Sequence, residues 1–138
     1  MASDIEQQND RIVELLRGEL DDVIAVYRFG STAHGTASTR SDTDIAVLAP
    51  KRLPPDLRFD TQERLATILG SDVDLVDLAA ATPVMAVQVI GRGDLLYEGD
   101  RVARGQFEDW ALGAYARLNE ERRGILERVK SEGTVYGR

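Results

Sequence analysis

The fold of this chain depends on residues 23–48, which read VIAVYRFGSTAHGTASTRSDTDIAVL. Two short runs rich in β-branched and aromatic residues, 23–29 and 42–49, enclose a polar segment that contains two glycines. Short apolar runs that stop at glycine or proline are typical of buried strands. The stretch therefore predicts a strand, a turn and a second strand, with Gly30 and Ser31 at the end of the first strand.

The rest of the chain alternates between helical and strand patterns. Apolar residues at helical spacing predict helices, and short apolar runs between turn residues predict strands. The expected helices span residues 5–20, 57–69, 83–91 and 102–130, and the further expected strands span residues 73–78 and 94–99. Helices that interleave with strands predict an α/β (α+β) fold, a small mixed sheet of about four strands backed by helices, with residues 1–138 as a single domain.

Composition restricts the classes of function. The chain has no cysteine, which removes disulfides, zinc–thiolate sites and cysteine nucleophiles. With 24 acidic and 17 basic residues the net charge is −7, so direct nucleic acid binding through a broad basic surface is not expected. The first residues, MASDIEQQND, lack the basic and apolar regions of a secretory signal, and no apolar run of membrane-spanning length occurs. We therefore expect a cytoplasmic protein without a membrane segment.

Two carboxylates stand at the start of the second strand. The chain contains fourteen aspartates, so about one Asp-x-Asp pair is expected by chance. The pair indicates a function only because of its position at the start of a strand. On a strand, Asp42 and Asp44 point to the same face, while Thr43 and Ile45 point to the other. Paired carboxylates repel unless solvent or a cation compensates them, and oxygen ligands suit Mg²⁺ or Mn²⁺. The pair predicts a metal site.

Gly30 and Ser31 have two interpretations. A glycine lets the backbone approach a phosphate closely, and a serine hydroxyl with the N–H groups of a following turn would bind its oxygens. An ordinary turn with a capping serine explains the same two residues.

A third carboxylate is expected from the strand at residues 73–78. Alternation places Asp72 and Asp74 on one face and Asp77 on the other. Asp74, inside the strand, is the better candidate for a two-metal site, in which two cations activate an attacking hydroxyl and stabilise the leaving oxygens. The alternative is a solvent-facing aspartate on an edge strand.

The order Gly-Ser, ten residues, Asp-x-Asp and an apolar strand resembles the signature of the nucleotidyltransferase superfamily that includes DNA polymerase β. With VDLV at residues 73–76, the short length and the C-terminal helix, the chain most resembles the minimal nucleotidyltransferase (MNT) antitoxins of HEPN/MNT toxin–antitoxin systems. The resemblance implies a triphosphate held by Gly30 and Ser31, and catalytic, metal-binding roles for Asp42, Asp44 and Asp74. Where the family often has GSxARG, this chain has GSTAHG, so we expect His34 to be a loop residue without a catalytic role.

The activity that the resemblance implies is a Mg²⁺-dependent protein adenylyltransferase, with two ions. It would move AMP from ATP to a tyrosine of a cognate HEPN ribonuclease toxin and release pyrophosphate, and so neutralise the toxin. Two alternatives remain: an antitoxin that acts by binding alone, and a nucleotidyltransferase with a small-molecule acceptor.

The long helix at residues 102–130 exceeds what a chain of this size needs for its own core, being roughly 40 Å long at about 1.5 Å per residue. Its charged end, NEERRGILER, fits either a solvated helix face or a surface for a partner protein. Trp110 is expected to be an anchor in the core or in an interface.

Overall fold

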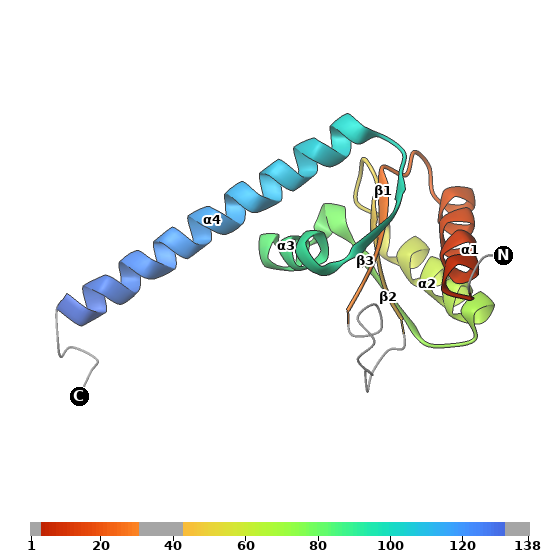
Figure 1. Cartoon of the computed structure of the whole chain (residues 1–138), viewed down its shortest axis with the longest axis horizontal. Helices are drawn as coiled ribbons and strands as arrows, with labels where there is room; N and C mark the ends of the chain where they lie inside the picture. Colours follow the sequence, from red (N-terminus) through yellow and green to blue (C-terminus); the bar gives the residue numbers. More distant parts are fainter. Residues whose placement is uncertain (1–3, 31–42, 132–138) are drawn as a thin grey trace.

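A computed structural model describes residues 4–30 and 43–131 of the chain (Figure 1). The elements, in chain order, are α1 (Asp4–Glu19), β1 (Ala25–Phe29), β2 (Thr43–Leu48), α2 (Pro55–Leu69), β3 (Val73–Asp77), a 3₁₀ turn (Leu78–Ala80), α3 (Pro83–Arg92), β4 (Asp94–Glu98) and α4 (Arg101–Ser131). The predicted mixed sheet backed by helices is confirmed, and the described boundaries differ from the predicted ones by no more than two residues.

The four strands form one sheet in the order β3-β2-β1-β4. β1 is antiparallel to both β2 and β4, whereas β2 and β3 are parallel and are joined through α2. β1, which ends just before the Gly-Ser motif, and β2, which begins at the Asp-x-Asp motif, therefore occupy the centre of the sheet. β3 and β4 form its edges.

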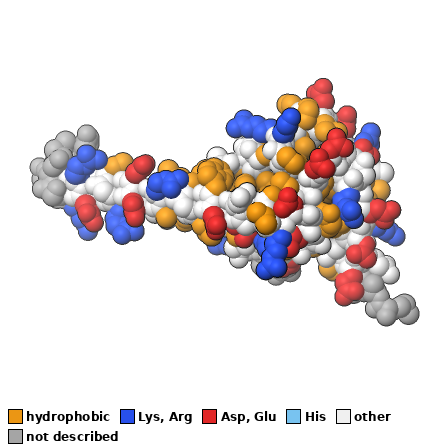
Figure 2. All heavy atoms as spheres, turned by 90° about the horizontal axis from the view of Figure 1, so that it is seen from above, with side chains coloured by type: hydrophobic (Ala, Val, Ile, Leu, Met, Phe, Trp, Pro, Cys, Tyr) orange, Lys and Arg blue, Asp and Glu red, His pale blue; other side chains and the backbone are white. Residues whose placement is uncertain are grey.

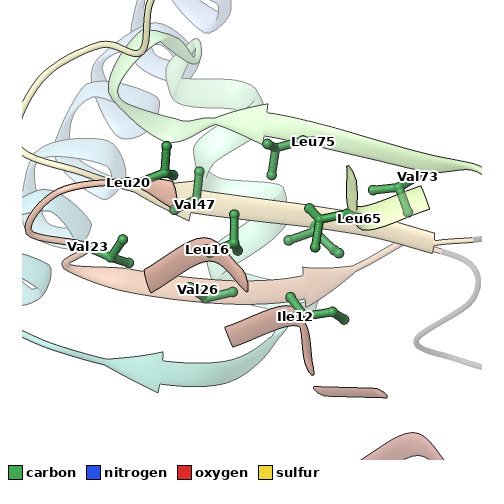
Figure 3. Packing of buried hydrophobic residues seen from close by; sticks show 10 residues of the cluster. Ile12, Leu16, Leu20, Val23, Val26, Val47, Leu65, Val73 and Leu75 are labelled. Atoms are coloured by element: carbon green, nitrogen blue, oxygen red, sulfur yellow. The ribbon is translucent and has the colours of Figure 1, made fainter. Parts of the chain in front are cut away.

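Helices cover both faces of the sheet (Figure 1). On one face, α1 and α2 pack on the inward side chains of the strands, and Figure 3 shows Ile12 and Leu16 of α1 and Leu65 of α2 over Val26 and Val47. On the other face, α3 and the first part of α4 cover a second core; its buried members are Ala25, Tyr27, Ala46, Leu48, Leu78 and Val89. The sheet is thus the middle layer of three.

Local sequence explains where the shorter helices begin and end. α2 starts at Pro55, two residues before the predicted start, because proline is tolerated in the first turn, where its missing N–H needs no partner. Gly70 ends the helix as predicted, in the left-handed conformation with φ 69°. Apolar spacing within residues 57–69 would place Ile68 on the buried face of α2, but Ile68 is 38% exposed and Thr61 is buried instead.

α4 begins on the body of the protein and continues beyond it (Figure 1). Its first part packs against α3, with Ala111 fully buried and Phe107 against the second core. Trp110 does not lie in the core: 47% of it is exposed, and its ring centroid lies 5.7 Å from that of Phe107. None of the helices formed by the described residues is long and apolar enough to cross a membrane.

Candidate active site

Gly30 and Asp44 are in direct juxtaposition where β1 ends and β2 begins. Phe29, the last residue of β1, is the register partner of Asp44, and Gly30 follows with φ +88°. A Cβ added to Gly30 would lie 2.1 Å from Asp44 Oδ2, a distance that no real Cβ can adopt. Position 30 therefore requires glycine for two reasons, its backbone conformation and the space that the carboxylate occupies.

Asp44 and Asp74 lie side by side on neighbouring parallel strands. They are register partners in the β2–β3 pair, and such partners point to the same face of a sheet whose strands are about 4.8 Å apart. Ala46, two residues after Asp44, belongs to the core beneath α3, so both carboxylates project from that face. Asp44 is partly buried and Asp74 is exposed.

The opposite face of the same strands carries the core that α1 and α2 cover. Thr43, Ile45 and Val47 are all buried, as strand alternation predicts. Asp77 also lies on that side of β3, where its Oδ2 accepts a hydrogen bond from Leu53 N at 2.8 Å and its Oδ1 accepts one from Ala79 N at 3.1 Å. Asp77 therefore has a structural role: it caps the 3₁₀ turn and holds the segment that leads to α2.

Ser31, Asp42 and His34 lie outside the described residues, so the phosphate-binding role of Ser31 and the metal-binding role of Asp42 stay predictions. Within residues 4–30 and 43–131, no three acidic or histidine side chains are grouped so that they could hold a metal ion. The site that the structure describes consists of Gly30, Asp44 and Asp74.

The chemistry of this partial site fits a divalent cation. Two carboxylates on adjacent strands repel each other, and their repulsion is relieved by solvent or by a cation between them. Their ligand atoms are all oxygen, which is the donor type that Mg²⁺ prefers. Asp42 precedes Asp44 by two residues in the sequence, and it would add a third carboxylate if the alternation of β2 extends to it.

Arg28 supports the end of β1 from the other face, a role that the sequence did not suggest. Its side chain is only 4% exposed, and its two terminal nitrogens donate hydrogen bonds to Asn9 Oδ1 at 3.0 Å and to Gln8 Oε1 at 3.2 Å. Burial lowers the pKa of the Arg28 guanidinium, and the negative charge of Asp94, its register partner on β4, opposes that shift. The start of α1 is thereby tied to β1 two residues before Gly30.

A second polar cluster joins α4 to the centre of the sheet. The hydroxyl of Tyr27, on β1, donates a hydrogen bond to Glu108 Oε2 at 2.9 Å, and Arg104 Nη1 donates to the same oxygen at 2.6 Å. Arg104 also pairs with Glu98 of β4. Burial, and then the hydrogen bond to Glu108, raise the pKa of Tyr27 to about 12. Arg104 and Glu108 are an i,i+4 pair on α4, which is a local pattern. Only long-range packing brings Tyr27 to this pair, so the sequence could not have indicated its part in the cluster.

The chain is similar in sequence to a protein of known activity. Over 126 residues the chain is 37% identical to the protein adenylyltransferase MntA of Shewanella oneidensis, which covers 91% of this chain and 90% of that protein. The similarity therefore extends along almost the whole length of both proteins.

Solved structures also match the fold of this chain over most of its length. One is a toxin–antitoxin complex with AMP-PNP, in which a chain 37% identical to this one superposes with a TM-score of 0.77 over 88% of this chain and 98% of its own. Another contains a tri-AMPylated HEPN toxin of Shewanella oneidensis in complex with an MNT antitoxin, with 34% identity, a TM-score of 0.75 and coverage of 91% and 98%.

The family model that matches the chain is that of polymerase beta nucleotidyltransferases, and it spans residues 10–102. This range includes the whole sheet and every residue of the candidate site. The resemblance inferred from the Gly-Ser and Asp-x-Asp motifs is confirmed, and the chain belongs to the polymerase beta nucleotidyltransferase family.

Proposed function

We propose that this chain is the antitoxin of a toxin–antitoxin pair and acts as a protein adenylyltransferase that modifies a tyrosine of its cognate HEPN toxin. The observation that carries the proposal is the arrangement of Gly30, Asp44 and Asp74 on adjoining strand ends, in a chain similar over nearly its full length to an adenylyltransferase. We place the activity in the cytoplasm, where its ATP substrate occurs.

The reaction transfers one nucleotidyl group. The tyrosine oxygen of the toxin forms a bond to the α-phosphorus of ATP, the bond between that phosphorus and the oxygen bridging to the β-phosphate breaks, and pyrophosphate leaves with the bonding electrons. The tyrosine proton passes to a base. Asp74 is exposed and next to Asp44, so it is accessible to an incoming protein side chain and is our candidate to accept or to orient that proton.

Mg²⁺ would be held by Asp42, Asp44 and Asp74, and when bound it supplies charge neutralisation for the triphosphate and a lowered pKa for the attacking hydroxyl. Gly30 and Ser31 would hold the triphosphate through backbone N–H groups and the serine hydroxyl. Gly30 also has a steric role in this scheme, because its lack of a side chain leaves room for the Asp44 carboxylate at the end of the strand.

A second candidate function is neutralisation of the toxin by binding alone. The observation that favours it is the outer part of α4, which projects from the body (Figure 1). Its large apolar side chains Leu118, Ile125 and Leu126 are exposed. Binding and transfer are compatible, and the adjacent carboxylates of Asp44 and Asp74 have no use in a protein that only binds.

The test is transfer of label from [α-³²P]ATP to the purified cognate toxin in the presence of Mg²⁺. Asp44→Asn, which keeps the shape of the side chain and removes its charge, is compared with Asp60→Asn, an exposed aspartate on α2. We expect label on the toxin with the natural chain and with Asp60→Asn, and at least a hundredfold less with Asp44→Asn. An unlabelled toxin in a stable complex with the natural chain would leave binding alone as the function.

A further inference from the structure

One side of α4 changes from buried to exposed along its length. At about 100° per residue, Phe107, Ala111, Leu118, Ile125 and Val129 fall within about 40° of one another around the helix. On this side Ala111 is fully buried against the body, Leu118 is 38% exposed and Ile125 is 53% exposed. The apolar side that packs α4 onto the body therefore continues past the point where the body ends.

We call Leu118, Ile125 and Val129 the outer stripe. They repeat at intervals of seven and four residues, the spacing at which a helix presents a continuous apolar seam to another surface. Leu126, 59% exposed, borders it. Leu118 and Ile125 are exposed and Val129 is partly buried. Exposed leucine and isoleucine in regular register are typical of an interaction site.

The charge around the outer stripe differs in sign from that of the whole protein. Residues 117–130 contain five Lys or Arg and three Asp or Glu, a net charge of +2, while the chain as a whole has −7. Figure 2 shows apolar side chains that continue along this arm between positively and negatively charged ones. An occupant with an apolar centre and a mildly acidic rim is favoured, whereas the like-charged arm of a second copy would repel this one.

The structural matches indicate which occupant to expect. The antitoxin chain solved with the tri-AMPylated HEPN toxin aligns with 91% of this chain. The part of this chain that does not align is shorter than α4. Part of α4 therefore has a counterpart in a protein that was solved together with its toxin.

We propose that the outer stripe of α4 is a docking surface for the cognate HEPN toxin. This inference rests on the proposed function and adds to it the surface that brings the toxin to the enzyme. The stripe and the site lie on different parts of the chain, because Gly30, Asp44 and Asp74 are at strand ends and the stripe is on the projecting half of α4 (Figure 1). Docking on α4 would therefore leave the site open to the acceptor tyrosine.

The experiment compares a stripe variant with a matched control on another side of the same helix. The stripe variant is Leu118→Asp/Ile125→Asp. The control is Leu112→Asp, because Leu112 is 49% exposed but lies about 120° around the helix from Leu118. Affinity for the purified toxin is measured by isothermal titration calorimetry, and circular dichroism checks that each variant is folded. The milder Leu118→Ala/Ile125→Ala covers the case in which the aspartates unfold the arm.

We expect the aspartate pair to weaken toxin binding at least tenfold, the alanine pair to weaken it less, and Leu112→Asp to bind as the natural chain does. Asp44→Asn should bind normally and transfer nothing, so loss of docking and loss of catalysis are separable. Normal toxin binding by both stripe variants would overturn the inference, as would a stripe-dependent dimer of the chain alone with toxin binding unaffected. A natural chain that neither binds nor labels the toxin would instead refute the proposed function.

Discussion

The Asp44 carboxylate occupies the space into which any side chain at position 30 would have to grow. Oδ2 of Asp44 would be 2.1 Å from a Cβ on Gly30, and Gly30 has φ +88°, which residues with a side chain rarely adopt. The glycine and the aspartate, fourteen positions apart in the sequence, are thus mutually dependent in the structure. The motif is a packing unit in addition to the set of ligands that we propose.

Gly30→Ala should therefore damage both the fold and the activity. The positive φ and the clash predict a loss of about 1–3 kcal/mol in the free energy of unfolding, measured with urea, and a loss of adenylyl transfer of at least a hundredfold. The control is Gly124→Ala, at a helical position where an added Cβ meets nothing within 4 Å. It should stabilise the protein by about 0.5–1 kcal/mol. Full activity of Gly30→Ala would contradict the juxtaposition.

Asp74→Asn should abolish transfer without unfolding the protein. Asp74 is exposed, so its substitution costs little stability, but it removes the carboxylate beside Asp44. The matched control is Asp72→Asn, two residues earlier in the sequence and also exposed. Initial rates of label transfer should fall at least a hundredfold for Asp74→Asn and less than threefold for Asp72→Asn. Equal rates for the two variants would remove Asp74 from the site.

Arg28→Ala should destabilise the protein through the end of β1. The substitution removes a buried side chain and its two hydrogen bonds to Asn9 and Gln8. We expect a loss of about 2–4 kcal/mol in urea unfolding, because a cavity and unpaired polar groups are left behind. Arg11→Ala, on the exposed side of α1, should change the stability by less than about 0.5 kcal/mol. A similar small change for both would show that Arg28 is not an anchor.

Tyr27 should make the stability depend on alkaline pH. Its pKa is about 12 in the folded protein against 10.0 for the free side chain, so the folded state holds the phenolic proton more strongly. The protonated hydroxyl of Tyr27 therefore contributes fully to the free energy of unfolding below pH 10, and this contribution is lost as the pH rises from 10 to 12. Tyr27→Phe should lower stability by about 1 kcal/mol at pH 8.

Unfolding by urea at several pH values tests this titration. The natural chain should lose more stability than Tyr27→Phe between pH 9 and pH 11.5, so the two curves converge. Tyr97→Phe is not a suitable control, because Tyr97 is partly buried and the Arg17 guanidinium lies over its ring. Tyr115 has no such contact among the described residues, so Tyr115→Phe is the control and should follow the natural curve. Parallel curves for Tyr27→Phe and the natural chain would contradict the raised pKa.

Much of the fold follows from local sequence. The apolar spacing of α1, the Thr82-Pro83 start of α3 and the Gly70 end of α2 were each predictable because they depend on residues within one or two turns. The buried α2 residue Thr61 and the exposed Ile68 were not, since the direction in which a helix faces its sheet depends on distant neighbours.

Local sequence was enough to specify the elements, the strand face on which Asp44 lies and the likeness to nucleotidyltransferases, because strand alternation and turn chemistry act over a few residues. Four features required the folded structure: Asp74 lies beside Asp44, Gly30 leaves room for a carboxylate, Arg28 anchors α1, and α4 leaves the body with its apolar side exposed. These features depend on strand order and on packing between distant segments, and no local pattern specifies the partner of a residue that lies far away in the chain.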